Sequence, residues 1–417
     1  MTVNNCISVR LTSEIRIEQA LKEAGVKKPA SVRKLAISGE ITEADFRYIR
    51  KKMAKTLQEL DMGDASVENN VLDGAPFVGC SGLTSITIPK TVEEIVLFAT
   101  ARTIMPPPDV NVDKNETSLV FNEDKTLIYC TRQFSNPDES ITYSAFSGCT
   151  ALTSINVHPD HHVFASEDGI LFNKEKSMLK FYPRGRHGDY NIPDSVVKIC
   201  DYVFAGCFGL TGITIPNSVV EIGERVFEFC RALTNVDLPN SVVEIGNMAF
   251  TNCDCLSSVA IPTSVAKIGE YAFCGCTSLT SVNIPTSITK IEAYTFCECS
   301  NLTTINIPAA VVEIGQGAFA KCTALTSVLL PNSVKTIRNQ AFWGCTALKV
   351  VTIPDSLSTI EDAVFAYCTS LEIHIPVSVM KRIDNIKYCI GAKNLFVPNE
   401  PTKIKGKNYF ILVANYL

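Results

Sequence analysis

A repeat of 23 residues is the feature that most limits how this chain can fold. From Cys207 to Cys368 the motif F-x-x-C-x-x-L recurs at every 23rd residue, and an isoleucine and a proline keep the same step. One such repeat cannot bury its own apolar residues, so the sequence predicts a solenoid in which successive coils stack. The cysteines of the motif are Cys80, Cys149, Cys207, Cys230, Cys253, Cys276, Cys299, Cys322, Cys345 and Cys368.

Residues 279–301, LTSVNIPTSITKIEAYTFCECSN, show how one repeat is expected to fold. Val282 and Ile284 should face the core and Asn283 the solvent, because side chains alternate along a strand. The proline that follows ends the strand, since it has no amide hydrogen for the ladder. A second short extended stretch comes next, and residues 293–299 are predicted to form a tight turn or a short 3₁₀ or helical piece.

Two C-x-C pairs, Cys274/Cys276 and Cys297/Cys299, raise the alternative of a zinc site. Stacked coils lie about 4.8 Å apart, so the motif thiols should form an inward column with parallel Cα–Cβ vectors. A disulfide needs convergent vectors, and therefore we predict reduced, structural thiols. Cys274 and Cys297 follow the phenylalanine directly and are predicted to point away from the core. The four sulfurs are thus not expected to converge as tetrahedral zinc requires, and we predict no metal.

Interruptions of the repeat divide the chain into four predicted regions. They are an N-terminal helical cap (1–65), irregular leucine-rich coils with two β-hairpin insertions (66–192), regular 23-residue repeats (193–375) and a C-terminal cap (376–417). The two ends are expected to close the core of the solenoid, as the ends of repeat arrays require.

Local signals predict individual elements in the first half of the chain. Residues 12–25 are predicted to form a helix that ends at Gly25, and TEAD (42–45) predicts a capping box before a second helix. Asn122–Lys125 and Asn173–Lys176 are predicted as the turns of the two β-hairpin insertions. Such insertions can carry recognition in repeat proteins, or they can be neutral ornament.

Composition and charge exclude several classes of protein. A hydrophobic content of 46% with 19% charged residues excludes a disordered chain. A formal net charge of −5 gives no electrostatic reason to expect nucleic acid as a partner. No apolar run is long enough for a membrane-spanning helix, and MTVNNCISVRLTSEIR shows no signal-peptide pattern.

The loop HPDHH (158–162) is the best candidate for a metal site. Convergence of His158, His161 or His162 with Asp160 would support the remote alternative of a metal-dependent hydrolase centred on this loop. The loop lies where the period breaks, however, which favours a solvated turn. No G-x-x-x-x-G-K-[ST], H-E-x-x-H or G-x-S-x-G motif occurs, so we predict a protein that is not an enzyme, with no catalytic residues and no cofactor.

The outward positions of the strands are the best candidate for a binding surface. They are small and mostly neutral, and can form a flat face for protein or glycan, or simply a soluble sheet face. We expect partner binding at the centre of the array, at Ser281, Asn283, Thr304 and Asn306. The two rows of this face are Asn235, Ser258, Ser281, Thr304, Ser327 and Val350, and Asp237, Ala260, Asn283, Asn306, Leu329 and Thr352.

The unit I-P-x-S-V-x-x-I-x-x-x-A-F-x-x-C-x-x-L-x-x-V-x-I, seen at 239–261 and onward, resembles the BspA-like leucine-rich repeat of bacterial and protist proteins. SEDGILFNKEKSMLKFYPRG (166–185) and LAISGEITEADFRYIR (35–50) resemble versions found in gut-anaerobe surface proteins. The resemblance covers roughly residues 30–380. It implies a right-handed solenoid, placement on the cell surface or secretion, and adhesion to host matrix proteins or other cells.

Together these observations predict a mainly β repeat solenoid, a right-handed leucine-rich-repeat coil with short 3₁₀ or helical turns and an α/β N-terminal cap. We expect a monomeric, non-enzymatic protein-interaction or adhesion module. Its partner should be an extended or multivalent protein, such as host extracellular matrix, or a glycan, because each coil offers only a weak contact. The alternative is a cytoplasmic scaffold that binds intracellular proteins.

Overall fold

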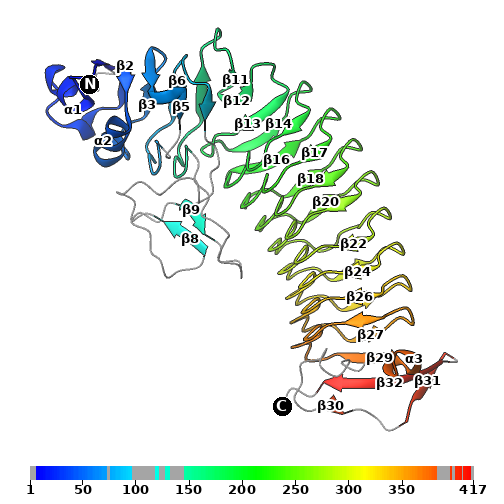
Figure 1. The fold of residues 1–417 in the computed structure, drawn as a ribbon. Coiled ribbons are helices and arrows are strands. Elements are labelled where there is room, and N and C mark those ends of the chain that lie inside the picture. The colour runs from blue at the N-terminus through cyan, green and yellow to red at the C-terminus, as the bar shows by residue number, and fades with distance from the viewer. Residues whose placement is uncertain are drawn as a thin grey trace. The chain divides into compact units, whose positions relative to one another are not determined.

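The computed structural model of the chain is a β-solenoid with little helix and an α/β region at its N-terminus, as the sequence predicts (Figure 1). It forms two compact units, Met1–Arg186 (the N-terminal unit) and His187–Leu417 (the C-terminal unit). The four-part division remains a prediction. The structure describes residues 6–72, 76–95, 118–121, 127–131, 145–382, 395–396, 400–405 and 407–414.

The N-terminal unit is built around a parallel sheet in the strand order β1-β2-β3-β6-β10, and β4 also pairs with β2. Its strands are β1 (Ile7–Leu11), β2 (Lys34–Ile41), β3 (Glu59–Asp61), β4 (Ala65–Val67), β5 (Val71–Leu72), β6 (Ser85–Ile88), β7 (Glu94–Ile95), β8 (Ser118–Phe121), β9 (Leu127–Thr131), β10 (Ser154–Val157), β11 (Phe164–Glu167), β12 (Ile170–Asn173) and β13 (Met178–Phe181). Its helices are α1 (Ile17–Glu23), η1 (Pro29–Ser31), α2 (Glu43–Met53) and η2 (Glu68–Asn70).

Both predicted helices are present. The first is shorter than expected, because the hydroxyl of Thr12 accepts the amide of Ile15 at 3.0 Å and holds a turn before α1. Gly25 follows α1 with a φ of +78°, a conformation that glycine adopts without strain. The capping box before α2 is confirmed, with Thr42 as the N-cap and Asp45 as its partner.

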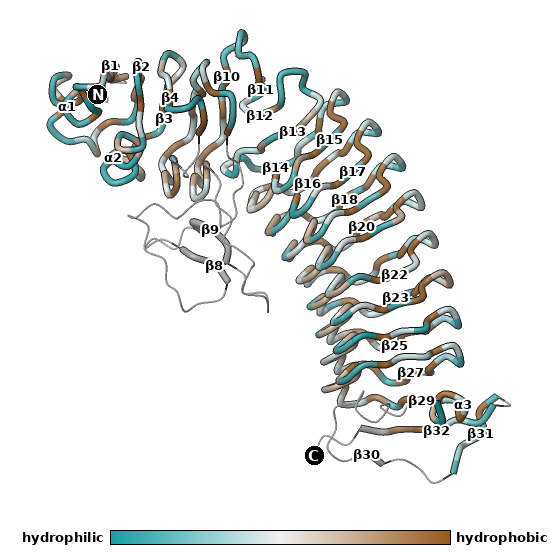
Figure 2. The backbone as a smooth tube through the Cα atoms, viewed as in Figure 1, coloured by the Kyte–Doolittle hydropathy of each residue, from teal (hydrophilic) through white to brown (hydrophobic). Residues whose placement is uncertain are grey.

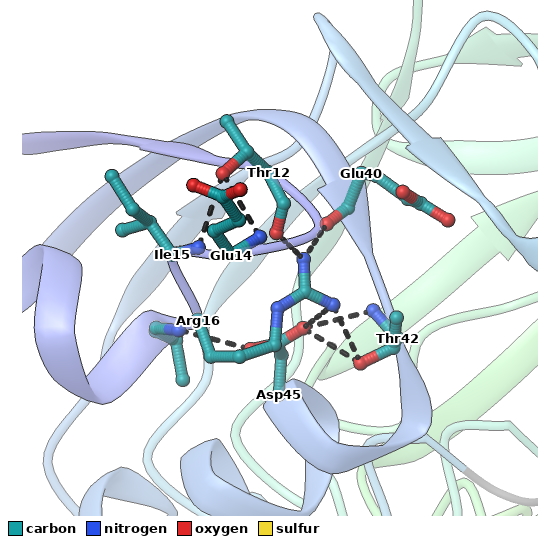
Figure 3. Close-up of polar contacts among 8 residues, drawn as sticks. Thr12, Glu14, Ile15, Arg16, Glu40, Thr42 and Asp45 are labelled. Atoms are coloured by element: carbon teal, nitrogen blue, oxygen red, sulfur yellow. Dashed lines mark hydrogen bonds and ion pairs between the residues drawn. The ribbon is translucent and has the colours of Figure 1, made fainter.

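Asp45 is the centre of a polar network that joins the two helices (Figure 3). It is only 1% exposed, and its carboxylate accepts hydrogen bonds from the amide of Ile17 at 3.0 Å and from the hydroxyl of Thr42 at 2.8 Å. The guanidinium of Arg16 lies 3.2 Å from the same carboxylate and donates to the carbonyl of Glu40 at 2.8 Å. The network thereby fixes the start of α1 against the start of α2.

The second β-hairpin is also confirmed. β11, β12 and β13 form an antiparallel meander, and the turn at Asn173–Lys176 closes with a 3.0 Å hydrogen bond from the amide of Lys176 to the carbonyl of Asn173. The predicted turn at Asn122–Lys125 lies outside the described residues, although the strands beside it, β8 and β9, pair antiparallel.

The C-terminal unit repeats two kinds of parallel strand. The strands that end at or shortly before a proline are β14 (Gly188–Asn191), β16 (Leu210–Thr214), β18 (Asn235–Asp237), β20 (Ser258–Ala260), β23 (Thr304–Asn306), β25 (Ser327–Leu329), β27 (Val350–Thr352) and β29 (Glu372–Pro376). The two-residue strands that follow it are β15 (Lys198–Ile199), β17 (Glu221–Ile222), β19 (Glu244–Ile245), β21 (Lys267–Ile268), β22 (Lys290–Ile291), β24 (Glu313–Ile314), β26 (Thr336–Ile337) and β28 (Thr359–Ile360). Partners in both sets lie 23 positions apart wherever consecutive regular coils pair, as in Glu313↔Thr336.

Phenylalanine rings form a continuous stack through the core of this unit. From Phe204 to Phe365, rings of neighbouring coils stack with centroids 5.0–5.6 Å apart. Figure 2 shows the apolar segments returning at matching places in successive coils. The stack explains why phenylalanine keeps its register along the sequence, since each ring is buried by the rings before and after it.

The segment that carries each phenylalanine is a turn and not a helix, which settles the alternative left open for residues 293–299. In this coil Tyr294 and Glu298 have φ values of 55° and 61°, and the same pair of positions has positive φ in the other regular coils. The left-handed conformation of these two residues orients the amides between them toward the next coil. The amide of Phe296, for example, donates to the carbonyl of Ala318 in the next coil at 2.8 Å.

A ladder of serine hydroxyls also joins successive coils. The serine of the I-P-x-S-V segment donates to a valine carbonyl one coil earlier, as Ser264 does to Val242 at 2.7 Å and Ser333 to Val311 at 2.7 Å. The sequence shows the serine at a fixed position, but its role becomes visible only once neighbouring coils are placed.

The C-terminal unit ends in an antiparallel arrangement. α3 (Val377–Met380) follows β29, and β32 (Lys407–Ala414) then pairs antiparallel with β29, the last strand of the parallel sheet. β30 (Leu395–Phe396) and β31 (Thr402–Ile404) both pair antiparallel with β32. In the part of the chain that the structure describes, no helix has the length and apolar character needed to cross a bilayer.

Candidate functional site

The four residues predicted to bind a partner lie together on the exposed face of the C-terminal unit. Ser281, Asn283, Thr304 and Asn306 are all exposed, while the residues between them, Val282 and Ile305, are buried. Asn283 bridges to Asn306 in parallel register, so each residue of one coil lies beside its counterpart in the next.

We call the two outward rows around these residues the polar face; their members are Asn235, Ser258, Ser281, Thr304, Ser327 and Val350, and Asp237, Ala260, Asn283, Asn306, Leu329 and Thr352. All twelve are exposed. Asp237 is the one charged residue among them. The face therefore repeats small neutral groups at the spacing of neighbouring strands, about 4.8 Å.

Two exposed apolar residues interrupt the polar face beside the four predicted residues. Leu329 is 75% exposed and lies next to Asn306, and Val350, which is 43% exposed, lies next to Ser327. Both residues stand in the rows identified from the sequence, but only the structure shows how far Leu329 projects. It is the most exposed large hydrophobic residue in the described part of the chain.

Charged side chains on the short strands pair with one another. Lys267 lies 2.6 Å from Glu244, and Arg338 bridges Glu313 at 3.2 Å and Glu361 at 2.8 Å. The hydrogen bond that Lys267 donates to Glu244 raises the pKa of Lys267. Since these surface charges pair with one another, they suit solubility better than recognition of a charged partner.

The motif cysteines form the predicted buried column, and their thiols are hydrogen-bonded. Within the C-terminal unit each thiol from Cys230 to Cys368 donates to a phenylalanine carbonyl 26 residues earlier, at 3.1–3.2 Å. None of the fifteen cysteines whose side chains the structure describes forms a disulfide. A small residue with a weak donor is needed at this position because the carbonyl of the preceding coil faces it.

The prediction that Cys274 points away from the core is wrong. Cys274 is only 2% exposed and Cys297 is half-buried, because the position after the phenylalanine faces a second buried layer, which Thr251 and Ala320 occupy in other coils. A hydrogen bond with Cys274 is the largest cause that raises the pKa of Cys297, so these two thiols are neighbours. No group of three or more potential metal ligands occurs among the described residues.

Two histidines of the HPDHH loop accept hydrogen bonds from backbone amides in or directly after the loop, and His158 Nδ1 lies 3.7 Å from the carboxylate of Asp160. His161 is 1% exposed, and its Nδ1 accepts hydrogen bonds from the amides of Val163 and Phe164 at 3.2 Å each. These two bonds fix the turn, and they leave this nitrogen no lone pair for a metal ion. Burial is the largest cause that lowers the pKa of His161, so the ring is neutral at pH 7. His158 lies at the surface, where its Nδ1 accepts the amide of Asp160 at 3.2 Å. These contacts favour a structural loop over a metal site.

The thiol column gives a chemical prediction. Burial raises the pKa of Cys80 to about 12 and that of Cys276 well above its ordinary value, so few column thiols are ionised near pH 8. Most of the 17 cysteines should therefore react with a thiol reagent in non-reducing denaturant, but few in the folded protein. Exposed Cys6 and Cys255 serve as internal controls that react in both states. Eight stoichiometric disulfides, the most that 17 cysteines can form, would contradict the column.

A comparison with protein families finds a match in the region of the repeats. The family model described as "BspA type Leucine rich repeat region (6 copies)" matches residues 180–303, 245–372 and 289–410. These matches span residues 180–410, which is more than half of the 417-residue chain. No curated protein sequence is significantly similar to this chain.

Solved structures of bacterial repeat proteins are similar at low identity. A leucine rich cell surface protein from Faecalibacterium prausnitzii is 23% identical over 81% of this chain and 82% of its own, with a TM-score of 0.42. A leucine-rich repeat protein from Eubacterium ventriosum is 20% identical over 89% of this chain and 93% of its own, with a TM-score of 0.42. A leucine-rich repeat protein from Treponema pallidum is 26% identical over 55% of this chain and 96% of its own, with a TM-score of 0.38.

Proposed function

Because the chain belongs to the BspA-type leucine-rich repeat family, we propose that it is a non-enzymatic module that binds a macromolecular partner, acting in adhesion at the cell surface or after secretion. The polar face of the C-terminal unit is the proposed contact surface. Its partner is an extended or multivalent protein, of which host extracellular matrix is the leading candidate, or a glycan.

The observation that carries this proposal is the in-register repetition of exposed groups. Asn283 and Asn306, and likewise Thr304 and Ser327, present matching side chains on adjacent coils. A single coil offers little binding energy, because strong anchors are usually aromatic or arginine side chains in desolvated pockets. Many coils in one register can add weak contacts to an extended partner, which gives high effective concentration without a deep pocket.

Leu329 adds an apolar anchor to this surface. Its side chain is 75% exposed beside Asn306. A partner that covered this side chain would remove apolar area from water, which contributes about 25 cal/mol per Å². We therefore place the centre of the contact between Ser281 and Leu329.

Replacing Ser281, Asn283, Thr304 and Asn306 together with glutamate is expected to weaken binding. Four carboxylates on a neutral face add repulsion and a desolvation cost to any contact there. Binding should be measured on immobilised extracellular-matrix proteins. The thermal unfolding midpoint should stay nearly unchanged, because the four side chains are exposed.

A matched control places four glutamates on the same unit away from the polar face, at Thr263, Thr286, Thr289 and Asn332, which are also exposed. This control should bind as the unmodified protein does; an equal loss would indicate a general charge effect. If binding survives the first change but disappears when residues 167–185 are deleted, the β12–β13 hairpin is the recognition element.

The alternative of a cytoplasmic scaffold makes a different prediction about location. Fractionation of cells that produce the native protein distinguishes the two. Recovery from the medium or the surface fraction supports adhesion, and recovery only with cytosolic proteins supports the scaffold.

A further inference from the structure

A cavity between the two N-terminal helices lies outside the polar face and has no role in the function proposed above. Its volume is about 770 Å³, within the range of about 300–1,000 Å³ that is typical of small-molecule sites. Figure 1 shows α1 and α2 at the same end of the N-terminal unit. The cavity is lined by Glu18, Leu21, Lys22, Gly25, Val26, Lys27, Pro29, Tyr48 and Lys52.

The walls of the cavity combine an apolar floor with polar groups. Leu21 is 1% exposed, and Val26 and Tyr48 pack against the hydrophobic core of the unit. Tyr48 lies close to Glu18 across the two helices: burial, and then the charge of Glu18, raise the pKa of its phenol. One wall thus offers a flat ring, a hydroxyl and a carboxylate to a ligand.

Only one of the three lysines that line the cavity forms an ion pair with a described residue. Lys22 forms an exposed ion pair with Glu18 at 2.9 Å. No ion pair is formed by Lys27 or Lys52 with the residues that the structure describes. Lys27 lies in the turn after α1, and Lys52 lies in the last turn of α2. The lining therefore carries three ammonium groups against one carboxylate.

The last carbonyls of α1 accept hydrogen bonds from backbone amides of the turn that follows the helix. The carbonyl of Leu21 accepts the amide of Val26 at 2.9 Å, and that of Lys22 accepts the amide of Gly25 at 2.9 Å. The local sequence, like the cavity, has an excess of basic residues. Residues 22–55 contain ten lysines and arginines against four acidic residues, whereas the whole chain has a net charge of −5.

We propose that this cavity binds an acidic sugar. Lys27 and Lys52 would hold its carboxylate or sulfate, Glu18 and the Tyr48 hydroxyl would receive its hydroxyl groups, and the apolar C–H face of the sugar ring would lie against Tyr48 and Leu21. A free acidic monosaccharide and the acidic end of a glycan share this chemistry. Their contacts with the cavity are the same, so both sources are tested below.

Isothermal titration of the full chain with glucuronic acid, and with glucose as the neutral counterpart of the same ring, tests the proposal. Glucuronate is expected to bind and glucose to bind at least about tenfold more weakly, because only the former has a charge for the two lysines. A heparin-derived oligosaccharide should compete for the site whether the natural source is free or polymeric. If it binds much more tightly than the monosaccharide, the source is a glycan; if the two bind alike, the source is the free sugar.

The variant Lys27→Glu/Lys52→Glu should weaken glucuronate binding by about tenfold or more, since it replaces attraction with repulsion at both contacts. The matched control Lys28→Glu/Lys51→Glu makes the same change of net charge at the two exposed neighbouring lysines, and it should bind within about twofold of the unmodified protein. Equal losses in both variants, or equal binding of glucose and glucuronate, would overturn the proposal. Because the polar face is unchanged in both variants, binding to matrix proteins reports separately on the function proposed above.

Discussion

Replacing Phe273 with alanine is expected to lower the free energy of unfolding by about 3–5 kcal/mol. The ring is completely buried and stacks between those of Phe250, at a centroid distance of 5.2 Å, and Phe296, at 5.6 Å. Alanine would leave a cavity that cannot collapse easily, because parallel ladders of hydrogen bonds hold the coils on both sides. Denaturant titration followed by circular dichroism measures the change.

Ser281→Ala in the same coil is the control for this prediction. Ser281 lies on the polar face and is exposed, so its replacement should change the free energy of unfolding by no more than about 0.5 kcal/mol. Similar losses for Phe273→Ala and Ser281→Ala would show that the inward and outward positions of the repeat have been assigned wrongly.

Replacing Asp45 with alanine is expected to cost about 3 kcal/mol, for two reasons. The change removes the capping box of α2, and it leaves Arg16 and the amide of Ile17 without the carboxylate that now satisfies them. Arg16 keeps some access to water, with 31% of its side chain exposed, and this places the cost at the low end for a broken buried pair. Hydrogen exchange of the α1 and α2 amides should locate the loss in the N-terminal unit.

Two further variants test which contacts of Asp45 account for the loss of stability. Asp45→Asn keeps the shape and one acceptor but removes the charge, so it should lose less stability than Asp45→Ala. Glu18→Ala breaks an exposed i,i+4 pair with Lys22 and should cost less than about 0.5 kcal/mol. An Asp45→Ala protein as stable as Glu18→Ala would contradict the role assigned to the network.

The fold could be predicted from the sequence because each coil repeats the same packing arrangement. A fixed step of 23 residues between phenylalanines and between cysteines requires that equivalent positions meet in space, and the stack from Phe204 to Phe365 follows directly. The capping box at Thr42 and the turn at Asn173–Lys176 were predictable for another reason. Their hydrogen bonds join residues only a few positions apart, so short sequence patterns carry them.

Features that depend on contacts between coils were harder to predict. The turn around Phe296 has residues with positive φ such as Tyr294 and Glu298, and the only sequence signal for this conformation is the glycine at the position of Glu298 in some other coils, such as Gly275. The prediction that Cys274 points outward fails because two consecutive side chains of this turn, Phe273 and Cys274, are both buried. The candidate site could be predicted in part. The rows of the polar face follow from the alternation of side chains along a strand, whereas the exposure of Leu329 depends on packing. The cavity beside Tyr48 also depends on packing and has no sequence signal.

The antiparallel pairing of β32 with β29 has a consequence for self-association. A parallel sheet that ended at β29 would present free amides and carbonyls on which the first coil of a second molecule could stack, and such edges are templates for polymerisation. β32 occupies this edge from Pro376↔Tyr409 to Glu372↔Val413, and it runs in the opposite direction. β30 and β31 in turn pair with β32. A second array that approached this end would meet an antiparallel strand in place of the parallel edge of β29, which disfavours head-to-tail stacking.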